Sequence, residues 1–183
     1  MMRHLPNLLS ALRLGLAPFA AWAVLHDHDS AALAVFAVAG LSDLLDGWIA
    51  RRFGFTSAFG AWLDPIADKL LMLFCFIALL RVEAVPLWLV VLVLGRDLLV
   101  AMGVLLARAL SLPLRMVPLG VGKAATAVEL LYIGAALSLL ALNRDAPSLM
   151  LAAAATVSLF VLLSGLAYLY VFLRALIFGQ RIA

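Results

Sequence analysis

The chain has 183 residues, of which 67% are hydrophobic and 13% are charged. This composition excludes an ordinary soluble domain, in which about half of the residues are apolar and about a quarter are charged. The formal net charge of +3 comes mostly from Lys and Arg at the ends of apolar segments, a pattern typical of membrane topology rather than of nucleic-acid binding. The single cysteine, Cys75, excludes an internal disulfide and is expected to pack in the core.

Six apolar segments are long enough to cross a membrane. Residues 1–13 form a short amphipathic lead, and the predicted spans lie at about 12–25, 31–50, 61–80, 85–107, 118–142 and 147–173. A secretory signal peptide is the alternative for the first segment, because Ala21-Trp22-Ala23 resembles a cleavage site. We predict an all-α integral membrane protein with six transmembrane helices and a short N-terminal amphipathic juxtamembrane segment, forming a single domain over residues 1–183.

The distribution of Lys and Arg predicts the orientation of these spans. Six spans place both termini on one side of the membrane, and that side holds Arg3, Arg13, Arg51, Arg52, Lys69, Arg108, Arg115, Lys123, Arg174 and Arg181. The other side has only Arg81 and Arg144. Because cytoplasmic loops carry the excess of basic residues, both termini are expected on the cytoplasmic side of the cell (inner) membrane.

Residues 43–68 hold four of the ten acidic residues, Asp43, Asp46, Asp64 and Asp68, between strongly apolar flanks. A carboxylate at the centre of a membrane helix costs about 2.5–3.5 kcal/mol on insertion scales, so a compensating partner is expected. Ligand sets made only of oxygen atoms favour a hard cation, Mg²⁺ first and Mn²⁺ or Ca²⁺ after it. The stretch therefore predicts a metal site at the cytoplasmic end of two helices.

The polar positions of this stretch fall on one face of each of two helices. They recur at i, i+3, i+4 and i+7 on the first helix and at i, i+4 and i+8 on the second: Asp43, Asp46, Gly47 and Ala50, then Gly60, Asp64 and Asp68. Two helices joined by so short a link are expected to pack antiparallel, which lets the acidic faces meet. Carboxylates meeting there would repel one another unless a metal held them.

The spacing D-x2-D-G-x2-A-R-x8-G-x3-D-x3-D resembles the signature of the CDP-alcohol phosphatidyltransferases, and Arg51 completes it. A second family pattern, P-N-x2-S/T-x2-R, is matched by Pro6, Asn7, Ser10 and Arg13. The alternative is a pair of membrane helices with incidental polar residues. It is disfavoured because ionisable residues inside a membrane are functional by default.

The resemblance implies transfer of a phosphatidyl group from CDP-diacylglycerol to an acceptor hydroxyl, with release of CMP. It implies two Mg²⁺ ions, with Mn²⁺ possible, bound by the four aspartates, and Asp68 as the base that accepts the hydroxyl proton. It further implies a homodimer and no nucleic-acid partner. The residues expected to bind the CDP group are Asp43, Gly47, Ala50, Arg51 and Gly60.

Three cations outside this stretch are predicted to bind the acceptor: Arg96, Arg115 and Lys123. Arg96 and Asp97 interrupt the fourth span. Because adjacent residues do not face each other on a helix, we expect Arg96 to turn towards the acidic seam or a substrate phosphate. The alternative for Arg96 is a buried pair with a carboxylate such as Glu129.

Within the family, the chain is most similar to the bacterial CMP-forming cardiolipin synthases and the phosphatidylglycerophosphate synthases. The Arg96-Asp97 pair favours the first group, whose acceptor is phosphatidylglycerol, and glycerol 3-phosphate is the alternative acceptor. Two other classes of protein also hold metal between aspartates. An intramembrane prenyltransferase lacks the D-G-x2-A-R run, and an ion carrier usually has paired repeats and broken helices.

Overall fold

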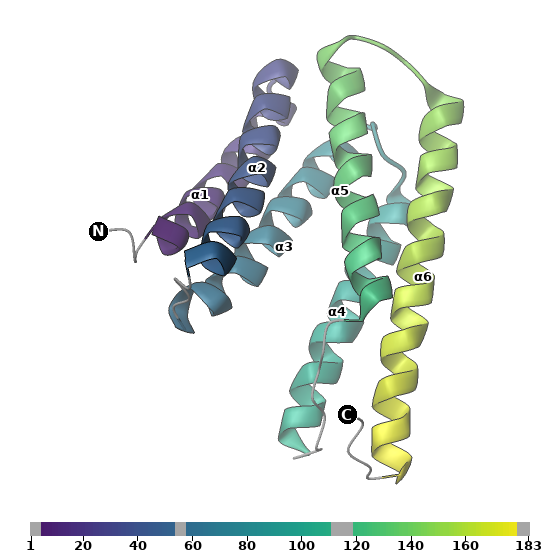
Figure 1. The fold of residues 1–183 in the computed structure, drawn as a ribbon. Helices are drawn as coiled ribbons and strands as arrows, with labels where there is room; N and C mark the ends of the chain where they lie inside the picture. The colour runs from purple at the N-terminus through teal and green to yellow at the C-terminus, as the bar shows by residue number, and fades with distance from the viewer. Residues whose placement is uncertain (1–4, 54–57, 111–118, 179–183) are drawn as a thin grey trace. The chain divides into compact units, whose positions relative to one another are not determined.

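The computed structural model describes residues 5–53, 58–110 and 119–178. Within the helices, the side chains of residues 5–9, 43–53, 58–63 and 178 lie outside the description. The described residues form six α-helices, drawn in Figure 1: α1 (Leu5–Leu25), α2 (Asp29–Phe53), α3 (Ala58–Arg81), α4 (Leu87–Ala109), α5 (Gly120–Ala141) and α6 (Pro147–Phe178). The described residues contain no strand, which confirms the all-α prediction. Residues 5–13 of the amphipathic lead and the first apolar segment are parts of one continuous helix, α1.

Among the described residues, three helices are long and apolar enough to cross a membrane: Leu87–Ala109, Gly120–Ala141 and Pro147–Ile177. The described residues of α1 and α2 add two shorter apolar helices, Ser10–Leu25 and Asp29–Ser42. α3 includes Asp64, Asp68, Lys69 and Arg81, and these charges interrupt its apolar length. The helices are those of a membrane protein, and a count of six spans stays a prediction.

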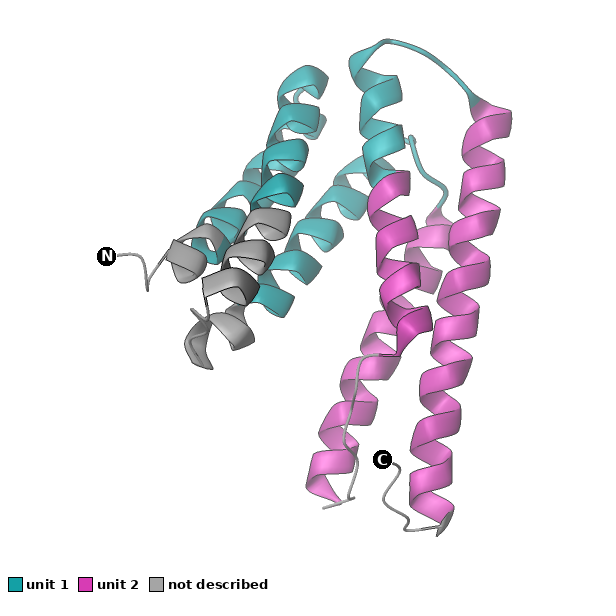
Figure 2. Cartoon of the chain, viewed as in Figure 1, with its two compact units in different colours: residues 1–86, 133–146 teal, residues 87–132, 147–183 magenta. Residues whose placement is uncertain are grey.

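The helices form two compact units, coloured separately in Figure 2. Unit 1 comprises residues 1–86 and 133–146, and it holds α1, α2, α3 and the C-terminal part of α5. Unit 2 comprises residues 87–132 and 147–183, and it holds α4, α6 and the N-terminal part of α5. The stretch with the four aspartates belongs to unit 1, and Arg96 and Lys123 belong to unit 2.

In unit 1, α1 packs against both α2 and α3. The face of α1 that makes this possible is built from small residues, since Ala17, Ala20 and Ala23 are completely buried. Small side chains let helix backbones approach closely, which is the usual basis of helix packing in membranes. Cys75 on α3 is completely buried, which confirms the expectation that it packs in the core.

The three turns that follow α1, α3 and α5 share one backbone geometry. Each contains a residue other than glycine with positive φ: Asp27 (60°), Glu83 (58°) and Asn143 (49°). In each, the next residue donates its N–H to a carbonyl five positions back, as Ala84 does to Leu79 at 2.9 Å. These are Schellman caps, which satisfy the last carbonyls of a helix and turn the chain sharply. The same Schellman cap therefore ends α1, α3 and α5.

A glycine at one of these caps should stabilise the protein. A left-handed conformation costs an ordinary L residue about 1–2 kcal/mol, and glycine avoids that cost. We expect Glu83→Gly to raise the free energy of unfolding by about 1 kcal/mol, measured by thermal unfolding in detergent. Glu83→Ala is the matched control, because it removes the same charge but keeps the Cβ. Equal stability of the two variants would contradict this account of the cap.

Candidate functional site

Two of the four motif aspartates are described, and both lie on α3. Asp64 and Asp68 are one helical turn apart, so they share a face of the helix, as the spacing predicts. Asp43 and Asp46 lie in the C-terminal half of α2, where side chains are outside the description. The same holds for the residues expected to bind the CDP group: Asp43, Gly47, Ala50, Arg51 and Gly60. The meeting of the two acidic faces therefore stays a prediction.

Both described aspartates are held by side chains of α1. The hydroxyl of Ser10 donates a hydrogen bond to Oδ1 of Asp64. Nη1 of Arg13 donates to Oδ1 of Asp68 and forms an ion pair with it. The side chain of Arg13 is 1% exposed, whereas that of Asp68 is 39% exposed. The carboxylate of Asp68 is thus supported from inside the bundle and still reaches the surface of unit 1.

Ser10 and Arg13 belong to the P-N-x2-S/T-x2-R pattern, but the sequence alone indicates no role for them at the site. A signal was present, because an arginine three residues after a serine puts two polar groups on one face of an apolar helix. What the spacing did not reveal is the partner helix. Only the packing of α1 against α3 brings these residues, more than fifty positions apart in the sequence, into contact.

The donor chemistry at this place fits a magnesium ion. Mg²⁺ takes oxygen ligands, and the described polar atoms facing each other here are carboxylate and hydroxyl oxygens together with one guanidinium. Among the described side chains, no group of three or more His, Cys, Asp or Glu residues is close enough to hold a metal. The remaining ligands predicted by the motif, Asp43 and Asp46, are outside the described side chains.

Arg96 on α4 lies inside unit 2, where its guanidinium meets three partners. Nε and Nη2 donate to the hydroxyl of Ser164 at 3.1 and 2.7 Å, and Nη2 donates to the carbonyl of Gly122 at 3.4 Å. Nη1 forms an ion pair with Asp97 at 2.7 Å. The expectation that adjacent residues cannot neutralise each other was therefore wrong. The expectation considered only where the Cβ atoms point, whereas a long arginine side chain can reach the carboxylate of the neighbouring residue.

The start of α5 is closely packed around Gly122. A Cβ at Gly122 would lie 2.9 Å from the hydroxyl oxygen of Tyr168, so only glycine fits there without a shift. The same hydroxyl accepts a hydrogen bond from the backbone N–H of Leu119 at 3.3 Å, and the Tyr168 ring lies 6.0 Å from the guanidinium carbon of Arg96. Ser164 and Tyr168 are one turn apart on α6. They were not singled out as site residues from the sequence.

Of the predicted acceptor residues, Arg96 is buried and Lys123 is exposed in the first turn of α5. Arg115 lies outside the described residues. Arg96 donates to the carbonyl of Gly122, which directly precedes Lys123 in the chain. The structure thus places Lys123 on the surface of unit 2, whereas Arg96 is buried and supports the first turn of α5, which carries Lys123.

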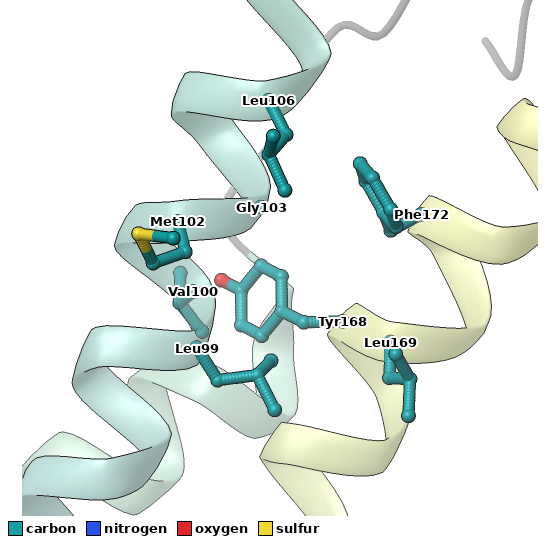
Figure 3. Close-up of a pocket in the computed structure, with 8 residues that line it drawn as sticks. All are labelled: Leu99, Val100, Met102, Gly103, Leu106, Tyr168, Leu169 and Phe172. Carbon is teal, nitrogen blue, oxygen red and sulfur yellow. The ribbon is translucent and has the colours of Figure 1, made fainter.

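An apolar cavity of about 210 Å³ lies between α4 and α6. Figure 3 shows the side chain of Tyr168 pointing from α6 towards α4, with Gly103 and Leu99 beside it. The rest of the lining is hydrocarbon and thioether: Val100, Met102, Leu106, Leu169 and Phe172. Gly103 has open space where a Cβ would point, so a glycine here leaves room rather than serving close packing.

Comparison with known proteins identifies the family. Residues 3–169 match the CDP-alcohol phosphatidyltransferase family. A cardiolipin synthase (CMP-forming) of Rattus norvegicus is 37% identical over 150 residues, which cover 73% of this chain and 50% of the rat protein. A protein of the same description from Streptomyces coelicolor is 41% identical over 109 residues, covering 55% of this chain and 51% of that protein.

A probable phosphatidylglycerophosphate synthase of Mycobacterium tuberculosis is 37% identical over 138 residues, covering 72% of this chain and 64% of that protein. The chain spans about half the length of the rat relative. Relatives named as synthases of two different lipids are thus each 37% identical to this chain, so overall identity does not distinguish between them. The match extends over most of the residues, including both halves of the aspartate motif, and the chain belongs to the CDP-alcohol phosphatidyltransferase family.

Proposed function

We propose that this chain transfers the phosphatidyl group of CDP-diacylglycerol to the hydroxyl of an alcohol acceptor and releases CMP. The observation that carries the proposal is the complete D-x2-D-G-x2-A-R-x8-G-x3-D-x3-D motif in a chain of this family. The acceptor oxygen attacks the phosphorus, the bond from phosphorus to the CMP oxygen breaks, and the acceptor proton leaves to a base. The described histidines, His26 and His28, follow α1 at the end of that helix opposite Ser10, so activation of a nucleophile by either of them at the motif is disfavoured and direct displacement is preferred.

The four aspartates supply the charge that this reaction needs. We assign Asp43, Asp46, Asp64 and Asp68 as the ligands of Mg²⁺, with two ions expected. When bound, Mg²⁺ would polarise the phosphorus under attack and neutralise the charge of the leaving CMP. Asp68 is also assigned as the base that accepts the acceptor proton, and its half-exposed side chain supports that role.

The CDP group is assigned to the α2 end of the motif and to the start of α3. Asp43, Gly47, Ala50, Arg51 and Gly60 carry this role by their match to the family motif. Small residues at three of these positions would leave backbone accessible to a bulky nucleotide. Arg51 would pair with a phosphate oxygen through charge-assisted hydrogen bonds.

For the acceptor, we propose phosphatidylglycerol, which makes the product cardiolipin. The apolar cavity between α4 and α6 supports an acceptor with acyl chains, because its lining would suit hydrocarbon and the described residues that line it include no charged side chain. The Arg96-Asp97 pair is also typical of this branch of the family. Glycerol 3-phosphate remains the second candidate, since a phosphatidylglycerophosphate synthase is among the relatives.

Arg115 and Lys123 are proposed to meet the phosphate of the acceptor, with Lys123 exposed for direct contact. We assign Arg96 to the same acceptor region. Its contacts with Ser164 and the carbonyl of Gly122 favour an indirect part, in which it holds the first turn of α5 in place. The whole chain would then act as one catalytic domain. It would cross the cell membrane six times, and two copies would form a homodimer.

Loss of a motif carboxylate should abolish transfer. We expect Asp64→Ala and Asp64→Asn each to lower the rate at least about 100-fold, because the neutral amide keeps the size of the ligand but not its charge. The measurement is release of CMP from radiolabelled CDP-diacylglycerol, with Mg²⁺ and after its removal by a chelator. Asp145→Ala, in the exposed turn before α6, is the matched control. Turnover of Asp64→Ala close to that of the parent protein would contradict the assignment.

Membrane orientation can be tested with cysteines, because the native Cys75 is completely buried and gives little background labelling. Cysteines at exposed positions of the turns after α1 and α5, His28→Cys and Arg144→Cys, should react with an impermeant maleimide from outside intact cells. Arg108→Cys, in the last turn of α4 on the predicted cytoplasmic side, should react only after permeabilisation. Labelling of Arg108→Cys in intact cells would mean that the span count or orientation is wrong.

The acceptor assignment is tested by substrate preference and by Lys123. The purified protein should use phosphatidylglycerol in preference to glycerol 3-phosphate. Lys123→Ala should raise the acceptor KM about 10-fold and the CDP-diacylglycerol KM much less, because one charge-assisted hydrogen bond contributes about 1.5–3 kcal/mol. Arg108→Ala, which removes an exposed charge at the end of α4, is the control. If the protein used glycerol 3-phosphate and did not use phosphatidylglycerol, the acceptor assignment would be wrong and the proposed reaction class would stand.

A further inference from the structure

One face of α1 changes from polar to apolar along its length. Its buried residues recur at helical spacing from Ser10 and Arg13 to Ala17, Ala20 and Val24. The alanine and valine part is ordinary helix packing. The first two positions are not, because a buried hydroxyl and a buried guanidinium on an apolar helix both need partners. Those partners are the motif aspartates of α3.

The two contacts form a matched ladder between parallel helices. Ser10 contacts Asp64, and Arg13 contacts Asp68. The later residue of α1 contacts the later residue of α3, so the two helices run in the same direction. The rise between the α1 residues is about 4.5 Å and between the aspartates about 6 Å, since an α-helix rises about 1.5 Å per residue. The near match lets both contacts form at once. α1 therefore holds both carboxylates with one rigid surface.

The exposure of Ser10, Arg13 and Asp68 distinguishes the supporting side chains from the catalytic one. Ser10 is completely buried and Arg13 is 1% exposed, so neither is placed to touch a substrate. The side chain of Asp68 is 39% exposed and lies between buried Arg13 and the surface. Each α1 residue thus holds a carboxylate oxygen from within the bundle. In metal sites, hydrogen-bond partners of this kind orient the ligands and tune the affinity for the ion.

We propose that Ser10 and Arg13 are positioning residues that align Asp64 and Asp68 for a divalent cation. This inference rests on the proposed function, in which these aspartates bind Mg²⁺. Ser10 fixes the orientation of the Asp64 carboxylate through one hydrogen bond. Arg13 holds Asp68 by a charged pair, which also balances one of the carboxylates while α1 and α3 pack together. The N-terminal helix is then part of the active site although it does not contact the substrate.

The test measures metal binding directly, without substrate. The full chain is purified in detergent, freed of metal, and titrated with Mn²⁺, whose binding is followed by electron paramagnetic resonance. We expect Ser10→Ala and Arg13→Gln to weaken Mn²⁺ binding about 10- to 100-fold, the usual effect of removing a partner of a metal ligand. Ser10→Thr keeps the hydroxyl and should bind Mn²⁺ as the parent protein does. Arg13→Lys keeps the charge but not the planar donor group, and should fall between.

Two controls make the same chemical changes away from the aspartates. Ser158→Ala removes a hydroxyl on α6 that donates to the carbonyl of Ala154 in its own helix at 2.7 Å. Arg81→Gln removes an exposed charge in the last turn of α3. Neither should change Mn²⁺ binding. Thermal unfolding of every variant checks the fold, and if Arg13→Gln does not fold, Ser10→Ala against Ser10→Thr still decides the question.

Kinetics give a second, independent measurement. For Ser10→Ala, the Mg²⁺ concentration for half-maximal activity should rise with the Mn²⁺ dissociation constant. At saturating Mg²⁺ its kcat should recover while the KM for CDP-diacylglycerol stays unchanged, because the ligands are misaligned rather than lost. A general loss of packing would instead lower the thermal stability and leave the metal dependence as it was.

The outcomes separate this inference from the function on which it rests. If the parent protein binds Mn²⁺, Asp64→Asn loses it, and Ser10→Ala and Arg13→Gln retain it in full, the positioning role is wrong and the proposed function stands. If the parent protein binds no Mn²⁺ and transfers no phosphatidyl group, the proposed function is wrong, and this inference is wrong with it.

Discussion

Charge inside an apolar helix bundle must be balanced where it lies, and this requirement organises one cluster of polar residues in each unit. In unit 1 the buried guanidinium of Arg13 meets Asp68. In unit 2 the buried guanidinium of Arg96 meets Asp97, Ser164 and the carbonyl of Gly122. A buried charge that loses its partner destabilises a protein strongly, so each cluster restricts the helices that carry it to one arrangement. The polar residues therefore specify packing that small apolar side chains alone would specify loosely.

The two clusters do different work although both contain a buried arginine. Arg13 is directed at a motif carboxylate that reaches the surface of its unit, so its effect is felt at the place where a metal is proposed to bind. Arg96 is directed at the backbone of α5 and at a serine of α6, so it joins three helices around Gly122. The first cluster would set the affinity for a cation. The second would set the position of Lys123, the exposed cation assigned to the acceptor.

The sequence predicted the helical class and the reaction family well, because charge in an apolar segment and the spacing of Asp64 and Asp68 are local signals. It did not predict what Ser10 and Arg13 contact, since that depends on how α1 packs against a helix far along the chain. The ion pair of Arg96 with Asp97 was missed for another reason: helical spacing places Cβ atoms, and a long side chain can reach beyond its own position. The turn geometry at Glu83 was also out of reach, because no glycine marks it.

The contact of Arg13 with Asp68 has a consequence for how the protein is made. The two residues are 55 positions apart, so α1 is synthesised and meets the membrane before Asp68 exists. During that interval the guanidinium of Arg13 lacks this counter-charge. Synthesis of α3 supplies it, and a buried charge is stabilised only once its partner is in place. The final packing of α1 thus depends on α3, through the same pair of side chains that supports the candidate active site.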